Sequence, residues 1–277
     1  MSVINTNTAA LRAQNGSRVA NNQLQTAMER LSSGKRINTA KDDAAGLAIA
    51  SKMTSQIRGM NQAIRNANDG ISYAQTAEGA LGEVTNMLQR IRELAVQSAS
   101  GTYSDDDRAN LESEVSELKA QITNTLATAE FNGTRIFNDN ASGSTYAAAS
   151  GSVAIQVGVN SGDTINVAFD QLSDLASTVA VDTQSEAEDS LASIDTTLTD
   201  VNATRAKLGA AQSRLDSTVN TLTSNVTNLS DARSRIEDAD FAQETANLAK
   251  AQILSQASTA MLAQANQSQQ GVLSLLR

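Results

Sequence analysis

Apolar residues recur between residues 57 and 95 in steps that mostly alternate between three and four. This spacing places one apolar stripe on a helix, and its repeat of seven is typical of a coiled coil. It predicts one long helix over about residues 43–98, roughly 80 Å at 1.5 Å per residue, which Gly101 would end. The stripe comprises Ile57, Met60, Ile64, Ala67, Ile71, Ala74, Ala77, Leu81, Val84, Leu88, Ile91 and Ala95.

Two more helices follow from the same pattern. Ser104 is a predicted N-cap, and the three aspartates after it favour the positive end of a helix dipole. This helix is expected to end before the turn dipeptide Asn132-Gly133. The heptads return over residues 186–236, which predicts a third helix of about 75 Å. Two long helices of similar length predict a mainly α chain built as a long antiparallel rod.

The region 138–185 carries the main strand signal. Val153, Ile155 and Val157 alternate with other residues, a turn follows at residues 160–163, and Ile165 and Val167 alternate again. Alternation on both sides of a turn predicts a β-hairpin.

The two ends of the chain carry shorter apolar seams on helical arms. They comprise Ala20, Leu24, Ala27, Met28 and Leu31 near the N-terminus, and Leu254, Ala257, Met261, Ala265, Val272 and Leu275 near the C-terminus. Each arm is rich in Asn, Gln, Ser and Thr, so alone it buries too little apolar surface to offset the entropy of ordering it. The arms therefore need partners. We expect a terminal-arm coiled-coil domain from residues 1–40 and 237–277, and a helical rod domain from residues 41–236 that includes the hairpin region.

The amino-acid composition narrows the range of possible functions. The 277 residues include no His, Cys, Pro or Trp, so the commonest general base and the thiolate metal ligands are absent. Acidic clusters at residues 42–43, 105–107 and 237–240 are interpreted as helix starts and solvated surface. The net charge of −9 disfavours nucleic acid as a partner. We expect no enzyme, no metal, no cofactor, no membrane span and no cleavable secretory signal.

Several ordered blocks then resemble the bacterial flagellins. The N-terminal signature is matched by LSSGKRIN (31–38) and DDAAGLAI (42–49). Further matches are LQRIRELAVQ (88–97), FNGTRIF (131–137) and the tail that begins SRIEDADF (234–241). The resemblance covers about residues 1–140 and 185–277. Because only residues 138–185 lie between the blocks, the chain resembles a short flagellin without outer domains.

The resemblance implies a secreted structural protein. Flagellins leave the cell unfolded by the flagellar type III apparatus and form the extracellular filament used in swimming. The implied partners are further copies of the chain in an open helical homopolymer, an export chaperone on the C-terminal arm, and the filament cap and hook-junction proteins. The expected subunit-packing residues are Leu24, Met28, Leu31, Phe241, Leu254, Met261, Val272, Leu275 and Leu276.

The resemblance also implies recognition by innate-immune receptors. The positions that match the Toll-like flagellin receptor site are Gln89, Arg90, Leu94, Gln97 and Glu114, and residues 272–277 resemble a segment sensed by cytosolic inflammasome receptors. Arg90 and Leu94 are four residues apart, so they share a helix face, which we expect to be offset from the apolar seam. Gly34, between arm and rod, is the expected hinge for filament switching.

Two other classes of protein remain compatible with the sequence. A hook–filament junction protein shares the arm-and-rod architecture but forms only a thin collar. A soluble signalling coiled coil has similar heptads but lacks the flagellin-like ends.

Overall fold

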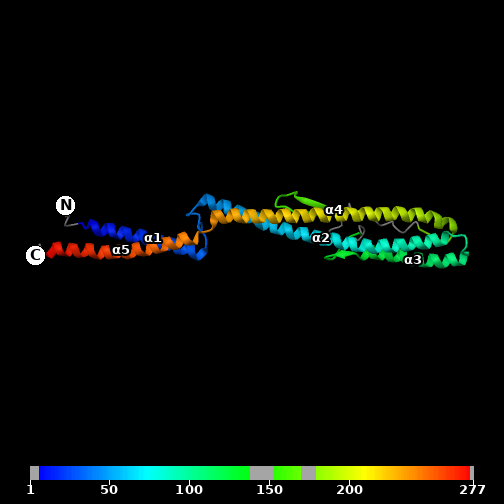
Figure 1. Cartoon of the computed structure of the whole chain (residues 1–277), viewed down its shortest axis with the longest axis horizontal. Coiled ribbons are helices and arrows are strands. Elements are labelled where there is room, and N and C mark those ends of the chain that lie inside the picture. The colour runs from blue at the N-terminus through cyan, green and yellow to red at the C-terminus, as the bar shows by residue number, and fades with distance from the viewer. Residues whose placement is uncertain (1–5, 138–151, 170–178, 275–277) are drawn as a thin grey trace. The chain divides into compact units, whose positions relative to one another are not determined.

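The computed structural model describes residues 6–137, 152–169 and 179–274 (Figure 1). Within these ranges the chain forms five helices and two antiparallel hairpins, as predicted for a mainly α chain with a small β-hairpin region. The helices are α1 (Thr8–Ser33), α2 (Ala44–Ala99), α3 (Asp105–Thr128), α4 (Gln184–Glu237) and α5 (Phe241–Ser274). The strands are β1 (Glu130–Phe131), β2 (Thr134–Arg135), β3 (Ser152–Gln156) and β4 (Thr164–Ala168).

The helices begin and end close to the predicted positions. Asp43 caps α2, because its Oδ1 accepts a hydrogen bond from the Gly46 N–H at 2.9 Å. Ser104 caps α3 in a capping box, in which Ser104 and Asp107 each bind the other's backbone N–H. Gly101 follows the end of α2 but does not adopt a left-handed conformation. Helix α2 thus ends two residues before Gly101, at the predicted place, but Gly101 does not cap it in a left-handed conformation.

A buried arginine stabilises the turn from α2 to α3 instead. The Arg108 guanidinium donates hydrogen bonds to the carbonyl oxygens of Ser100 at 3.0 Å and Tyr103 at 3.3 Å. Both carbonyls lie in the turn between α2 and α3, where the Ser100 carbonyl also accepts the Tyr103 N–H at 3.5 Å. Arg108 thus adds side-chain donors to the backbone hydrogen bond of this turn.

The chain divides into two compact units, residues 58–226 and residues 1–57 with 227–277. In the first unit α2 lies antiparallel to α4, since Arg92 Nε contacts Asp195 Oδ1 at 2.8 Å and Gln212 Nε2 donates to Glu78 Oε2 at 3.0 Å. Helix α3 also packs on α2. The core between the three helices includes Leu81, Val84, Leu88, Ile91, Leu94, Val115, Ile122, Ile194, Val201, Leu208 and Leu215.

The predicted hairpin is formed by β3 and β4, with Val153 opposite Val167 and Ile155 opposite Ile165. It lies against α2, where the Asn66 amide donates to the Gln156 carbonyl oxygen at 3.1 Å. A Cβ on Gly70 would stand 3.0 Å from Ile155. A glycine at this position of α2 therefore lets the hairpin approach the helix closely.

A second, shorter hairpin was not predicted as strands. Strands β1 and β2 are two residues each, joined by Asn132 and Gly133, which both have positive φ, 51° and 75°. Positive φ at both central residues matches the tight turn whose twist suits a hairpin. Phe131 on β1 packs edge-on against Tyr73 of α2, with ring centroids 5.9 Å apart.

Residues 179–181 return to the helices as an extended strap, held by side chains from all three. Lys119 Nζ donates to the Val179 carbonyl at 2.6 Å, and the Val181 N–H donates to Glu112 at 2.7 Å. Ser98 and Ser190 bind the remaining carbonyls. Satisfying these buried groups fixes where the chain re-enters the helical unit.

Candidate functional site

The terminal helices α1 and α5 form the candidate site, and each begins with its own cap. Asn7 caps α1, its side chain accepting the Ala10 N–H at 2.9 Å. Asp240 caps α5, accepting the N–H groups of Ala242 and Gln243 at 2.9 and 3.2 Å. Capping lets both helices start at defined residues.

A seam of small residues joins the two helices, which run antiparallel. Ala13, Ala20 and Ala27 are buried on α1 in steps of seven, and Ala251 and Ala265 are buried on α5, fourteen residues apart. Ser258 lies midway, and a Cβ on Gly16 would stand 3.3 Å from its Oγ. Because the side chains in the seam are small, the backbones approach closely, and larger apolar residues of both helices lie outside the seam.

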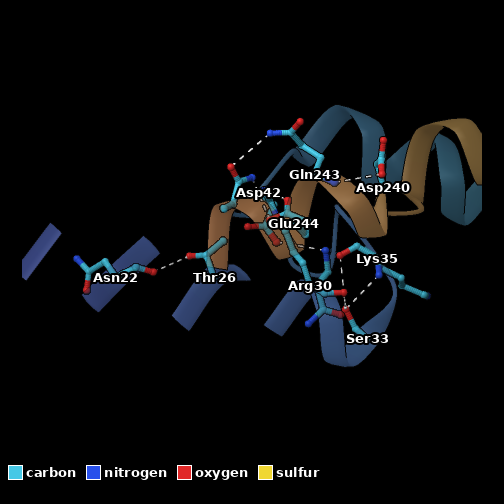
Figure 2. A network of polar contacts seen from close by, with 11 residues as sticks. Asn22, Thr26, Arg30, Ser33, Lys35, Asp42, Asp240, Gln243 and Glu244 are labelled. Carbon is cyan, nitrogen blue, oxygen red and sulfur yellow. Dashed lines mark hydrogen bonds and ion pairs between the residues drawn. The ribbon is translucent and has the colours of Figure 1, made fainter. Parts of the chain in front are cut away.

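Polar contacts connect the pair at both ends and in the middle. The Asn7 amide donates to the Ala265 carbonyl at 3.1 Å, and Ser255 Oγ donates to Asn21 Oδ1 at 3.0 Å. Figure 2 shows Arg30 of α1 reaching Glu244 of α5, where Nη1 and Oε1 are 2.9 Å apart. These contacts between distant residues have no local signal in the sequence. The predicted arm seams did contain three of the buried alanines, Ala20, Ala27 and Ala265.

Gly34, the predicted hinge, ends α1 in a left-handed conformation with φ 70°. Its carbonyl oxygen accepts the Ala239 N–H at 3.0 Å, and Arg36 N–H donates to the Glu237 carbonyl at 2.7 Å. Lys35 pairs with Asp238 in a β-bridge, and its ammonium lies 2.6 Å from Glu237. The residues after α1 are thus tied to those before α5, while a hinge role for Gly34 stays a prediction.

The loop between α1 and α2 is organised by Asp42. Its Oδ2 accepts hydrogen bonds from the Asn38 and Thr39 N–H groups at 3.2 and 2.9 Å and from the Thr39 hydroxyl at 3.0 Å. The bonds from Thr39 and then Asn38 favour the carboxylate and hold the pKa of Asp42 below its usual value. The loop also buries Ile37, against which Gly46 packs.

Large apolar side chains remain exposed on both terminal helices. On α5, Ile253, Met261 and Phe241 are 67%, 65% and 63% exposed. The full set, here called the apolar surface set, is Leu11, Val19, Met28, Phe241, Ile253, Leu254 and Met261. Each of these side chains is at least 41% exposed, and all of them lie on the helix pair α1 and α5.

The predicted packing residues fall into three groups. Leu24 and Leu31 are half-buried on α1. Met28, Phe241, Leu254 and Met261 are exposed and belong to the apolar surface set. Leu275 and Leu276, and the side chain of Val272, lie outside the described residues. Leu11, Val19 and Ile253 were missed, because each lies off the seams from which the prediction was made.

Most of the predicted receptor residues lie together on the surface of α2 and α3. Gln89, Arg90, Gln97 and Glu114 are exposed. Arg90 Nε donates to Glu114 Oε1 at 3.0 Å, and Nη1 donates to Glu93 at 3.1 Å. The hydrogen bond to Glu114 is the largest cause of a raised pKa of Arg90. The pair presents a charged, solvent-facing patch.

Leu94 lies elsewhere, and the expectation that its face is offset from the seam is wrong. It is 1% exposed and belongs to the core between α2, α3 and α4. Because α2 has two helical neighbours, its buried stripe is wider than one heptad seam. Direct receptor contact with Leu94 stays a prediction.

Metal binding finds no support in the described ranges. Within residues 6–137, 152–169 and 179–274 no cluster of three or more acidic, His or Cys side chains could hold a metal ion. In the same ranges no helix combines the length and hydropathy that a bilayer span requires.

Comparison with known proteins identifies the family. A family model described as the bacterial flagellin N-terminal helical region matches residues 4–142, and one described as the C-terminal helical region matches residues 191–276. The chain belongs to the bacterial flagellin family. Flagellin is a structural protein and not an enzyme, so the family match bears out that expectation.

Individual flagellins support the assignment. Flagellin from Salmonella muenchen is 48% identical over 171 residues, which cover 62% of this chain and 32% of that protein. B-type flagellin from Pseudomonas aeruginosa is 46% identical over 170 residues, covering 61% and 33%. The match thus spans about a third of the length of these relatives.

Solved structures share the fold. The crystal structure of Bacillus cereus flagellin superposes with a TM-score of 0.52 at 31% identity, covering 61% of this chain and 94% of that one. A protein assigned as a flagellar hook-associated protein from Vibrio parahaemolyticus gives a TM-score of 0.59 at 15% identity, covering 71% and 100%. At that identity the second match shows the fold alone.

Proposed function

We propose that the chain is the structural subunit of a bacterial flagellar filament, an extracellular helical polymer of many copies. The observation that carries this proposal is the apolar surface set on α1 and α5, which the described chain leaves uncovered. Membership of the flagellin family supplies the kind of assembly.

The energetics favour association through this surface. Fully burying one large apolar side chain contributes about 1.5–3 kcal/mol. Several such residues together offset the cost of association, about 4–15 kcal/mol. The apolar surface set has different residues on α1 and on α5. A copy whose α1 binds the α5 of a second copy therefore still presents its own α5 to a third copy. A head-to-tail contact of this kind that does not close produces an open helical polymer.

The composition suits export as an unfolded chain. Without proline there is no slow prolyl isomerisation, and without cysteine no disulfide can form before export. We propose type III export followed by folding at the filament tip under the cap. An export chaperone that covers the apolar face of α5 would prevent association inside the cell.

Receptor recognition is part of the same proposal. The exposed Arg90–Glu114 patch offers charged groups to a Toll-like flagellin receptor. Recognition by cytosolic inflammasome sensors involves residues 272–277, whose side chains lie outside the described residues. Hook-junction proteins would meet the same terminal helices at the base of the filament.

A hook–filament junction protein is the second candidate, because the hook-associated protein from Vibrio parahaemolyticus shares the fold. The two candidates differ in product. A filament subunit elongates without limit from a seed, whereas a junction protein adds a short collar and stops.

The test is seeded polymerisation of the full-length chain, followed by electron microscopy and sedimentation. We expect long tubular filaments from the unmodified chain. The double variant Ile253→Ser, Met261→Ser should polymerise poorly, because both exposed side chains would be buried between copies. The matched control replaces two exposed polar residues of α5, Gln252→Ser and Gln256→Ser. Polymerisation of the apolar double variant at the unmodified rate would refute the proposal, and collars in place of filaments would favour the junction protein.

A further inference from the structure

The sequence contains two Asn-Gly dipeptides, Asn15-Gly16 and Asn132-Gly133. In such a dipeptide the glycine nitrogen can attack the side-chain carbonyl carbon of asparagine, because glycine has no Cβ to hinder the approach. The attack needs a free nitrogen and a backbone that can rotate. In the fold, the two dipeptides differ both in how free the glycine nitrogen is and in how far the backbone can rotate.

Asn15-Gly16 is protected inside α1, whose interior N–H groups are bonded to carbonyls four residues earlier. The Asn15 side chain is held as well, since Oδ1 accepts from Arg18 Nη2 at 3.0 Å. Gly16 faces the seam with α5, beside Ser258. Attack at Asn15 therefore requires local opening of the helix.

Asn132-Gly133 is the exposed turn between β1 and β2. The strand pairs on either side are Phe131 with Thr134 and Glu130 with Arg135, so the two turn residues lie outside the ladder. A Cβ on Gly133 would meet nothing within 4 Å, which leaves room around the turn. The ladder between β1 and β2 comprises two residue pairs, so few backbone hydrogen bonds restrain the turn.

We propose that Asn132 is a site of spontaneous deamidation. The Gly133 nitrogen forms a bond to Cγ of Asn132, the Cγ–Nδ2 bond breaks, and ammonia leaves with the proton of the Gly133 amide. Water then opens the resulting succinimide. Opening at Cγ leaves an aspartate at position 132, and opening at the backbone carbonyl leaves an isoaspartate. One water is consumed and one ammonia released, with no change in oxidation state.

The modification alters the packing of the hairpin on α2. Asn132 and Asp69 line the same pocket of about 550 Å³, together with Tyr73. A carboxylate at position 132 therefore places a second negative charge beside this pocket. An isoaspartate also inserts an extra atom in the backbone, which the tight two-residue turn cannot accommodate. Both products loosen the contact between Phe131 and Tyr73. This inference is independent of the proposed function.

The experiment ages the full-length chain in mildly alkaline buffer and quantifies both sites by mass spectrometry. Trypsin releases residues 13–18 and 120–135 as separate peptides, one for each dipeptide. Chromatography separates aspartate from isoaspartate. We expect position 132 to convert about tenfold or more faster than position 15, the factor that corresponds to ~1.4 kcal/mol of local opening in α1.

The two free peptides are the controls, and they should convert at similar rates because both carry Asn-Gly. Equal rates at the two positions of the folded chain would overturn the proposal. Conversion at position 132 that is tenfold slower in the folded chain than in its free peptide would also overturn it, since the turn would then be protective. Hydrogen exchange of the aged chain should increase in β1 and β2 and stay unchanged in α1.

Discussion

Arg30 Nη1 of α1 and Glu244 Oε1 of α5 lie 2.9 Å apart across the alanine seam, with the Glu244 side chain almost buried. The seam alone repeats every seven residues, so a shift of α5 by one repeat would restore similar small-residue contacts. The ion pair forms in one register only. A polar contact beside an apolar seam commonly fixes register in this way, and we infer that Arg30 and Glu244 do so here.

Replacing Glu244 with alanine should destabilise the α1–α5 pair by about 1.5–3 kcal/mol, the range for a hydrogen bond to a charged group. The variant leaves the Arg30 guanidinium, whose Nε already lacks a partner, without its carboxylate. Amide hydrogen exchange of α1 and α5 in the full chain measures the effect. Gln243→Ala is the matched control, since Gln243 is exposed on the same turn. Equal protection in the two variants would contradict the prediction.

Register can be tested separately by crosslinking, because the chain contains no cysteine. Asn21 and Ser255 contact each other across the seam, with Ser255 Oγ 3.0 Å from Asn21 Oδ1. The double variant Asn21→Cys, Ser255→Cys should form a disulfide readily. We expect the yield to fall when Glu244→Ala is added. An unchanged yield would show that the alanine seam alone selects the register.

Gly34→Ala should destabilise the end of α1 by about 1–2 kcal/mol, because a residue with a Cβ is strained at φ 70°. Nothing lies within 4 Å of the added Cβ, so the cost is one of backbone conformation. Gly79→Ala is the control. Gly79 lies inside α2 with equally open surroundings, and there alanine should stabilise by about 0.5–1 kcal/mol.

If Gly34 acts as a hinge in the assembled filament, Gly34→Ala should also change the filament waveform. Dark-field microscopy of swimming cells reports the waveform directly. Cells with Gly79→Ala should swim normally. Unaltered waveform and swimming in Gly34→Ala would remove the hinge from the proposed function and leave the glycine with a capping role.

Lowering the pH should destabilise the loop before α2, and the sign of this effect follows from the pKa of Asp42. Its pKa is lower in the folded chain than the ordinary 3.8, because Thr39 and Asn38 bond to the carboxylate. A group of this kind stabilises the fold above its unfolded pKa, and the contribution is lost as pH falls through the folded pKa. Hydrogen exchange at Thr39, followed as pH is lowered from 5 toward 2, should show this loss. In Asp42→Ala the protection should be low throughout, and a pH profile like that of the unmodified chain would contradict the assignment.

The sequence predicted the long helices well, because their apolar residues repeat over many turns. Ser104 and Asp43 also carry local capping signals, so α2 and α3 begin where expected. Strands β1 and β2 are too short to show alternation, and only their Asn-Gly turn was visible. Leu94 was misplaced, because the sequence does not show that α2 packs against α3 and α4 at once.

The candidate site was predicted in part. The need for partners follows from the weak seams of the arms, and Met28, Phe241 and Met261 were identified in advance. Ala20, Ala27 and Ala265 of the alanine seam fell within the predicted arm seams, whereas Ala13 and Ala251 did not. The Arg30–Glu244 pair joins residues 214 positions apart. No local pattern predicts a contact of that separation.

The predicted receptor site can be tested with two variants, Leu94→Ala and Arg90→Ala, which should differ in their effect on stability. Leu94→Ala removes a fully buried side chain from the core and should lower the free energy of unfolding by about 2–5 kcal/mol. Arg90→Ala removes a solvent-exposed ion pair and should leave the unfolding midpoint nearly unchanged. Urea unfolding of the full chain, followed by circular dichroism, measures both.

Receptor activation by the same proteins then decides which residue makes contact. We expect Arg90→Ala to lose potency at a native unfolding midpoint, because the charged patch it forms with Glu114 faces solvent. For Leu94→Ala, loss of potency in proportion to the loss of stability would indicate an indirect effect through the core. Full potency of Arg90→Ala would remove this patch from the proposed receptor site, and a native midpoint for Leu94→Ala would show that the residue is not part of the core.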